Sequence, residues 1–316
     1  MASIFIQIAS YQDYELADTI LDAIKKSSKD HQLNFGVYIN YINDDFYTPN
    51  LPSIRYTKIK APEGIGVGYA RFEANALYGG EDYYLQIDSH TRFIENWDTM
   101  LVDLHREYVS EGFKPIISTR PLNYWYEETK GGVISFDSLD NAVQTLEFPV
   151  TEPGNRNNIF TLLKSVPNPE GNKFSKSISA GSCFSSGEYA DVVPNKKVQF
   201  LGEEQFGAAR YYTHGFDLMM LKKHFMWHLY FNKERGFRNF RNHTWKDFPE
   251  LCAARAIESE EEIVRIIRGK VIGDQEFGTK RTLEDYEDFA GIKFNAPPGS
   301  EPQAHEPPAS ESQQVS

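Results

Sequence analysis

The residues best suited to bind a metal ion come directly after a short apolar segment. Asp88 and His90 follow Tyr83–Ile87, and because they are two positions apart in an extended chain, their side chains can point toward one cation. A carboxylate and an imidazole together suit a divalent ion such as Mn²⁺. The alternative interpretation is ordinary loop chemistry, with Asp88 capping the next turn and His90 exposed.

Two adjacent carboxylates, Glu203 and Glu204, follow Gly202. They are either acids of a first helical turn, where the helix dipole favours negative charge, or groups that bind sugar hydroxyls or stabilise positive charge at an anomeric carbon. Both roles can coexist. His228 follows an aromatic, Met-containing segment, so it is either a satisfied core residue or, if it lies near Asp88, a further ligand.

Cations and aromatic rings alternate in the segment 228–246. This mixture could hold a diphosphate, close over a substrate as a mobile lid, or bind single-stranded nucleic acid. The alternative is a solvated amphipathic segment. Its charged members are Lys233, Arg235, Arg238, Arg241, His243 and Lys246, and its rings are Phe231, Phe237, Phe240 and Trp245.

Several common nucleotide-binding and hydrolase motifs are absent. The glycines at 64, 66 and 68 are not followed by Gly-Lys-Ser/Thr, and they lack the third glycine of a dinucleotide fingerprint. The sequence also contains no Gly-x-Ser-x-Gly elbow and no His-Glu-x-x-His zinc motif. We therefore do not expect an ATP-binding, NAD-binding, serine hydrolase or zinc protease site of these types.

The elements that position these residues alternate between strand-like and helix-like segments, which predicts an α/β fold with a parallel sheet. In such sheets ligands bind beyond the carboxyl ends of the strands, where Asp88 lies. We expect hairpins and long loops over residues 121–175. The predicted strands are Ile4–Ala9, Leu33–Asn40, Ile54–Lys60, Tyr83–Ile87, Pro115–Ser118 and Ala180–Ser186. The predicted helices are Glu15–Ser28 with Asp13 as its cap, Tyr69–Leu77, Trp97–Val109, one from Gly202 through Tyr212, one beginning at a Ser259–Glu262 capping box, and Leu283–Phe289.

Composition agrees with a folded, acidic chain. The 316 residues carry 33 Lys and Arg against 45 Asp and Glu, a net charge of −12, and 40% are hydrophobic. The length allows one large or two ordinary domains, and the acidity disfavours binding of nucleic acid through bulk charge. Beyond residue 296 the Pro, Ser, Glu and Gln content, without aromatic residues, predicts a disordered tail over 296–316.

The expected location is the cytoplasm. No apolar run approaches the roughly 18 residues of a membrane span, and Met1–Ser10 lacks the basic region of a secretory signal. Two cysteines, Cys183 and Cys252, exclude a disulfide framework. We expect both thiols to be reduced and no membrane partner.

These segments together resemble a known family. The phrase Tyr83-Tyr84-Leu85-Gln86-Ile87-Asp88-Ser89-His90, followed by Trp97-Asp98, is similar to cytoplasmic-type GlcNAc-transferases, known from the enzyme that modifies hydroxyproline on a ubiquitin-ligase adaptor. More distantly it resembles the mucin-type polypeptide GalNAc-transferases, which carry a similar Asp-Ser-His. The resemblance covers about residues 3–294 and includes Ile6–Tyr11, Ala70-Arg71, Ser179–Phe184, Phe200–Glu204, Thr282–Glu287 and Phe289–Ile292.

The resemblance implies a GT-A-type nucleotide-sugar-binding fold with a mixed, mostly parallel sheet flanked by helices. That domain would span residues 1–295, with a C-terminal helical segment from about 257 to 295. It also implies a metal-dependent, retaining transferase that moves GlcNAc, or a related sugar, from a UDP-sugar to a hydroxyl. The ion would be Mn²⁺ or Mg²⁺.

The resemblance also assigns roles to individual residues. Asp88, His90 and His228 would hold the metal ion, and Glu203 and Glu204 would bind the sugar or the acceptor. The other donor-binding residues would be Ala9, Ser10 and Tyr11 at the uridine, together with Arg71, Ser89, Gly181 and Arg235.

Two departures from the mucin-type pattern concern arginines. Pro62-Glu63-Gly64 stands where those enzymes have an arginine before the glycine, and Phe231 stands where they have an arginine three residues after the last metal ligand. Arg71 would therefore carry a different share of the diphosphate contact, and Lys233 or Arg235 would substitute at the second place.

The sequence leaves three hypotheses about the acceptor and the activity. A protein hydroxyl is the first hypothesis, and a hydroxylated DNA base, suggested by the basic residues of 231–246, is the second. The third hypothesis is a catalytically inactive scaffold that binds a sugar nucleotide.

Overall fold

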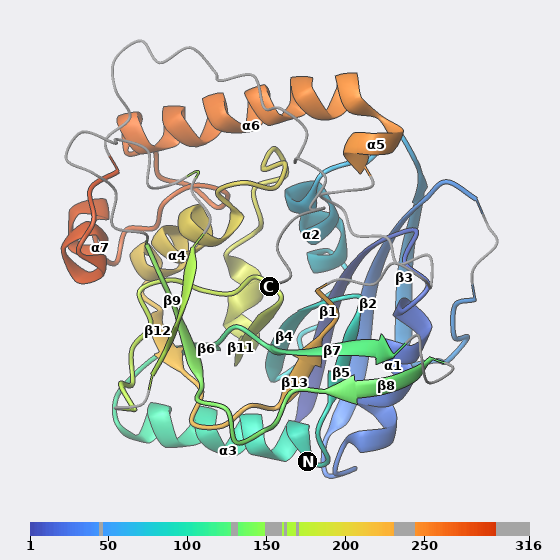
Figure 1. Ribbon diagram of the computed structural model, residues 1–316. Helices are drawn as coiled ribbons and strands as arrows, with labels where there is room; N and C mark the ends of the chain where they lie inside the picture. The colour runs from blue at the N-terminus through green and yellow to red at the C-terminus, as the bar shows by residue number, and fades with distance from the viewer. Residues whose placement is uncertain are drawn as a thin grey trace.

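A seven-stranded sheet forms the centre of the computed structural model (Figure 1), which describes residues 1–43, 47–127, 132–148, 160, 163–168, 171–230 and 244–294. All neighbouring strands are parallel except β11, which is antiparallel to both β4 and β6. The predicted mixed, mostly parallel sheet is confirmed. Its strands, in spatial order, are β12 (Asp217–Met220), β6 (Pro115–Ser118), β11 (Ser182–Ser186), β4 (Tyr83–Asp88), β1 (Ser3–Tyr11), β2 (Gln32–Tyr41) and β3 (Ile54–Lys60).

Helices cover both faces of this sheet (Figure 1). One face packs against α1 (Leu16–Lys26) and α3 (Trp97–Ser110), and the other carries α2 (Val67–Asn75), α4 (Glu203–Thr213), α6 (Pro249–Gly269) and α7 (Leu283–Ala290). Among the described residues there are also two short elements, the 3₁₀ helix η3 (Gly187–Asp191) and α5 (Trp245–Asp247). Within the described residues, no helix is long and apolar enough to cross a membrane.

The period-2 pattern of β1 explains why both faces need cover. Ile4, Ile6 and Ile8 contribute to the core beneath α1 and α3, whereas Phe5 belongs to the core on the opposite face. All four side chains are fully buried. A central strand that is apolar on both sides is typical of a parallel sheet between helical layers.

A second, four-stranded sheet lies beside the first and supplies one wall of the site. Its order is β5 (Thr91–Phe93), β13 (Met226–His228), β7 (Leu122–Glu127) and β8 (Val133–Phe136). A separate hairpin joins β9 (Gln144–Glu147) to β10 (Lys164–Pro167). The hairpins expected between residues 121 and 175 are therefore confirmed.

The predicted start of the charged helix at Ser259 is wrong. Helix α6 begins at Pro249, and Ser259 and Glu262 lie within it with buried side chains. The Ser259 hydroxyl accepts a hydrogen bond of 3.0 Å from the backbone N–H of Gln199, so a tertiary contact uses the oxygen that the capping interpretation assigned to the helix end. The structure places a capping box at α7 instead, between Thr282 and Asp285.

Glu262 links α6 to the loop before α4. Replacing it therefore tests how much this link stabilises the helical layer. Hydrogen bonds from Arg265 and Lys197 outweigh burial and hold the pKa of Glu262 at about 2. Because the pKa of this carboxyl is lower in the folded chain than its unfolded value near 4.5, its ionised form stabilises the fold at pH values above about 4.5. That stabilisation is lost as the pH falls through about 2.

Glu262→Gln should therefore lower the free energy of unfolding by about 1–2 kcal/mol at pH 7. The difference from wild type should shrink as the pH approaches 2.5, measured by denaturant unfolding at both pH values. Glu284→Gln, which removes the exposed pair with Lys270, is the control and should change little. An equal loss at both pH values would contradict this account.

Candidate active site

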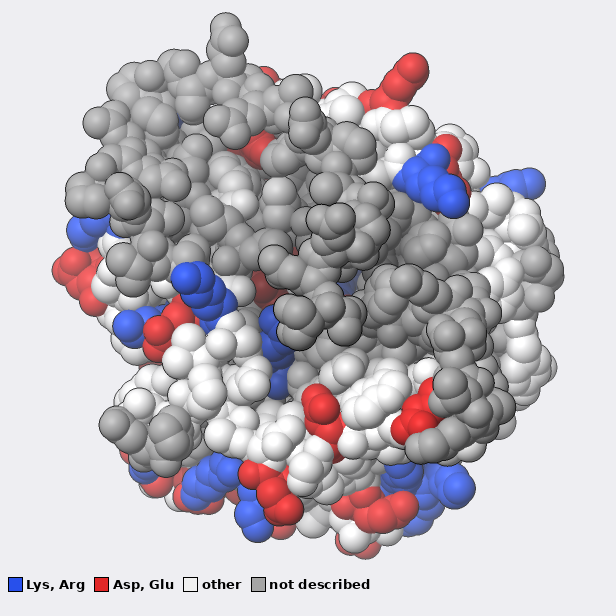
Figure 2. Space-filling model, in the orientation of Figure 1, with Lys and Arg blue, Asp and Glu red and all other residues white. Residues whose placement is uncertain are grey.

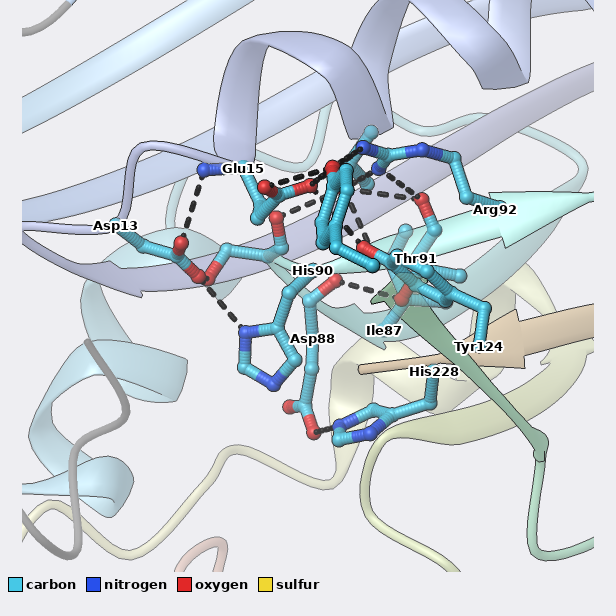
Figure 3. A network of polar contacts seen from close by, with 12 residues as sticks. Asp13, Glu15, Ile87, Asp88, His90, Thr91, Arg92, Tyr124 and His228 are labelled. Carbon is cyan, nitrogen blue, oxygen red and sulfur yellow. Dashed lines mark hydrogen bonds and ion pairs between the residues drawn. The ribbon is translucent and has the colours of Figure 1, made fainter. Parts of the chain in front are cut away.

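Three potential metal ligands converge at the carboxyl end of β4. Asp88 ends β4, and His228 ends β13, which pairs antiparallel with β5 so that His228 lies opposite Thr91. This pairing brings His228 Nε2 to 3.1 Å from Asp88 Oδ2. One ligand atom from each of Asp88, His90 and His228 lies within 4.8 Å of the others (Figure 3), and the described residues contain no other such group of three.

Asp13 orients His90 toward this centre. Its Oδ2 lies 2.7 Å from His90 Nδ1 and accepts a hydrogen bond of 2.5 Å from the Ser89 hydroxyl. The second ring nitrogen of His90 then faces Asp88 (Figure 3). The prediction that Asp13 caps α1 is wrong, because Glu15 occupies the cap position. Asp13 is 1% exposed; its carboxylate accepts a hydrogen bond of 3.0 Å from the Glu15 N–H, and its carbonyl accepts one of 3.3 Å from the Leu16 N–H.

A buried polar network holds the segment behind His90. Arg92 pairs with Glu15, whose carboxylate also accepts hydrogen bonds from Tyr124 at 3.2 Å and Tyr126 at 2.9 Å. The Arg92 guanidinium stacks over the Tyr124 ring at 5.0 Å. The network ties β5 and β7 to the start of α1 (Figure 3) and so fixes the second sheet, with His228, against the first.

Arg71 fixes the carboxylate of Asp88 from the opposite side. Its guanidinium is 3% exposed and donates to Asp88 Oδ1 at 2.8 Å and to the Ile87 carbonyl at 2.8 Å. It also donates to the Ala180 carbonyl at 3.2 Å and to Glu203 Oε1 at 3.4 Å. One side chain of α2 therefore joins the end of β4 and the start of α4 to the segment that leads into β11.

Gly181 leaves the space that the Asp88 carboxylate occupies. A Cβ at Gly181 would lie 2.6 Å from Asp88 Oδ2, closer than such atoms approach. The neighbouring Ala180 N–H donates to Glu204 Oε1 at 3.1 Å. Small residues before β11 thus form a cradle around Asp88 and Glu204.

Burial and neighbouring charges give the carboxyl groups different proton affinities. Burial raises the pKa of Glu203 to about 7 and that of Glu204 to about 8. Burial also acts on Asp88, but the hydrogen bond from His228 and the charge of Arg71 hold the pKa of Asp88 well below its usual range. Burial lowers the pKa of His228 to about 4. The site therefore presents an anion at Asp88 and a neutral imidazole at His228.

These groups line a cavity of about 430 Å³. Beyond Asp88 it runs along the carboxyl ends of β1 and β4, and its wall includes Gly64, Gly66 and the start of α4. Arg235 and the rest of 231–243 lie outside the described residues. The predicted site residues that the structure brings together here are Ala9, Ser10, Tyr11, Arg71, Asp88, Ser89, His90, Gly181, Glu203, Glu204 and His228.

The sequence-based prediction missed several residues of the site. Arg120 and Tyr230 line the cavity, and Asp13 lies directly behind His90. Arg120 follows β6, so the rule that pointed to Asp88, a polar residue after an apolar strand, could also have found it. Nothing in the sequence pattern marks Tyr230.

The residues present fit a divalent metal ion. One carboxylate and two imidazoles form a donor set that suits Mn²⁺ or a similar ion, and metal-binding histidines usually give their second ring nitrogen to a carboxylate, as His90 does to Asp13. The space at Gly181 keeps the Asp88 carboxylate in position. Asp88, His90 and His228 could therefore hold such an ion.

Comparison with known proteins adds a family and a fold. The sequence model described as "Glycosyltransferase (GlcNAc)" matches residues 47–296, whereas no curated protein sequence matches the chain. A crystal structure of GalNAc-T7 with UDP, GalNAc and Mn²⁺ is similar at 12% identity and a TM-score of 0.54, covering 92% of this chain and 55% of that chain. The chain thus spans little more than half the length of that protein. The structure of S. aureus TarS 1–349 matches at 13% identity and a TM-score of 0.42, over 82% of this chain and 71% of that one.

Asp13→Asn provides a test of the orientation of His90. The amide keeps the size of the side chain but removes the carboxylate that lies against His90 Nδ1, so we expect Mn²⁺ affinity to fall about 10–100-fold. Electron paramagnetic resonance of free Mn²⁺ measures this affinity. Asp18→Asn, at an exposed carboxylate on α1, is the control. Unchanged Mn²⁺ affinity in a folded Asp13→Asn protein would rule out this role.

Proposed function

The chain belongs to the glycosyltransferase (GlcNAc) family, and from this premise we propose that it transfers a sugar, GlcNAc in first place, from a UDP-sugar to a hydroxyl group. The observation that carries the proposal is the convergence of Asp88, His90 and His228 at the carboxyl ends of strands β1 and β4. This is the edge at which open α/β sheets bind their ligands. The fold shared with GalNAc-T7, which was crystallised with UDP, GalNAc and Mn²⁺, supports the same assignment.

The carboxyl end of β1 would receive the uridine. Ala9, Ser10 and Tyr11 line the cavity there, next to the positions of Gly64 and Gly66. The backbone requires glycine at these two positions, because φ is 69° at Gly64 and 138° at Gly66, values that side-chain-bearing residues rarely adopt. A Cβ at Gly64 would also lie 2.2 Å from the Tyr38 hydroxyl, so this part of the cavity wall is closely packed.

Asp88, His90 and His228 would hold Mn²⁺ or Mg²⁺, with Ser89 beside them. When bound, the ion supplies positive charge that neutralises the diphosphate as the sugar leaves. The task of this chain is to keep the three ligands oriented, which Asp13 does for His90 and Arg71 does for Asp88. Preorganised ligands need no rearrangement during the reaction.

Glu203 and Glu204, next to Gly181, would bind the hydroxyls of the donor sugar or position the acceptor. Because the pKa of each is raised to near neutrality, either group can accept or donate a hydrogen bond at physiological pH. We propose retention of configuration, with the acceptor attacking from the side of the leaving diphosphate. A phosphate oxygen then takes the acceptor proton, so no dedicated protein base is required.

A protein hydroxyl is the acceptor that we propose. On the face shown in Figure 2, acidic and basic side chains of the described residues are interspersed and form no continuous basic surface, which gives no support to a DNA substrate. Of the segment 231–246 that suggested nucleic acid, residues 231–243 lie outside the described residues, and Lys246 is its one cation within them. An inactive scaffold is the remaining alternative, and activity measurements separate it from a transferase.

The deciding experiment measures UDP release from UDP-GlcNAc, UDP-GalNAc, UDP-glucose and UDP-galactose, with Mn²⁺ and with EDTA. We expect slow hydrolysis of one donor, dependent on the metal, because water can replace the acceptor. Asp88→Asn should abolish this release, by a factor of about 100 or more. The variant is assayed at a temperature at which it is folded, because losing the charge that pairs with buried Arg71 lowers its thermal stability. Glu188→Gln, at an exposed carboxylate far from the cavity wall, serves as the control.

Two outcomes would contradict the proposal. If Asp88→Asn releases UDP at the wild-type rate without added metal, the metal assignment is wrong. If the wild-type protein neither releases nor binds UDP in the presence of Mn²⁺, the chain is not a UDP-sugar transferase. UDP binding without turnover of any donor would favour the scaffold.

A further inference from the structure

We propose that Arg120 binds the diphosphate of the donor and stabilises it as it leaves, a role that sequence comparison placed on Lys233 or Arg235. The inference rests on the proposed function, because it concerns the same cavity. It assigns the leaving-group cation to the end of β6 and not to the segment after β13. The supporting observations are the position, the freedom from ion pairing and the charge of Arg120.

Arg120 lies within reach of the metal-ligand cluster. Its guanidinium stacks over the ring of Tyr230 at 4.6 Å, and that ring lies 4.3 Å from the ring of His228. The Tyr230 hydroxyl donates to the Pro121 carbonyl at 2.9 Å, which anchors the ring. A planar cation is thus held one aromatic ring away from a metal ligand, on the wall of the cavity.

Arg71 forms ion pairs and hydrogen bonds with several protein groups, whereas Arg120 forms no ion pair with the described residues. Arg71 is 3% exposed and its guanidinium donates to Asp88, Glu203 and two backbone carbonyls. Arg120 is partly exposed, its side-chain partner among the described residues is Tyr230, and with those residues it makes no ion pair. These two are the only arginines or lysines among the described residues that line the cavity. Arg120 therefore retains donors for a ligand.

The charge balance of the cavity calls for such a cation. Its wall carries the carboxyl groups of Asp88, Glu203 and Glu204, of which Asp88 is ionised, and a diphosphate would add further negative charge. Arg71 offsets Asp88 and Glu203 directly. The charge of Arg120 reaches Glu204, where it opposes the burial that raises the pKa of this carboxyl.

The chemistry of transfer explains what this cation does. The bond between the anomeric carbon and the β-phosphate oxygen breaks, and its electron pair stays on that oxygen. The acceptor oxygen bonds to the anomeric carbon, and its proton passes to the phosphate. Two parallel N–H donors of a guanidinium match two phosphate oxygens, and they stabilise the charge that develops on the departing group.

The test compares binding of UDP with binding of uridine, because only UDP carries the diphosphate. Isothermal titration calorimetry in the presence of Mn²⁺ gives both affinities for wild type, Arg120→Gln and Arg120→Lys. We expect Arg120→Gln to weaken UDP binding about tenfold or more and uridine binding less than about twofold. Arg120→Lys should fall between, because it keeps the charge but loses the planar fork. It also keeps the test decisive if Arg120→Gln does not fold.

Two control variants separate this role from general effects. Arg106→Gln removes an exposed charge on α3 and should leave both affinities unchanged. Arg235→Gln tests the competing assignment directly: a large loss of UDP affinity there, with none at Arg120, would overturn the proposal. Equal loss of UDP and uridine in Arg120→Gln would also overturn it, since that pattern indicates damage to the whole cavity.

The experiment distinguishes failure of this inference from failure of the proposed function. If wild type binds UDP and both Arg120 variants bind it as tightly, Arg120 does not contact the diphosphate, and the transferase assignment stands. If wild type binds no UDP with Mn²⁺ present, the proposed function itself fails.

Discussion

The burial of one guanidinium constrains the architecture of the site. Removing a charged group from water is costly unless opposite charges and hydrogen-bond acceptors replace the lost hydration. Arg71 meets this requirement with Asp88, Glu203 and the carbonyls of Ile87 and Ala180. The ends of β4 and α4 and the segment before β11 must therefore converge on α2. Asp88, which we propose as a metal ligand, is held in position because it also neutralises a buried cation.

The second sheet acts as a support for this arrangement. Its strands bring His228 beside Asp88 through the β5–β13 pair, and the network around Glu15 and Arg92 ties them to α1. Pairing with β5 and β7 fixes the backbone at His228, and the hydrogen bond of 3.0 Å from the Leu229 N–H to the His90 carbonyl continues that pairing beside the site. The cluster thus depends on backbone pairing as much as on the ligands themselves, which is the usual division of labour between ligands and their supporting shell.

Sequence periodicity predicted most of the fold, because the strands and helices bury apolar faces with regular spacing. Strands β3 and β6 have the predicted bounds. Patterns that tertiary contacts can use in another way misled the prediction: Ser259 bonds to a distant backbone group inside α6, and Asp13 serves His90. The strand-end rule located Asp88 and His90 in the cavity. It could not show that Arg120 would stack over Tyr230, next to His228, since that contact depends on which strands become neighbours.

The antiparallel strand β11 has a consequence for how the chain is made. It lies between β4 and β6 although it follows both in sequence. These two strands therefore cannot join one sheet until residues 182–186 are available. The contacts at the site join residues 109 and 140 positions apart, from Arg71 to Ala180 and from Asp88 to His228. Such distant pairings close large loops and form late in folding. On the ribosome, a nascent chain that ends before His228 lacks one of the three proposed metal ligands, so an ion bound by all three would stabilise the fold by mass action only after this segment has emerged.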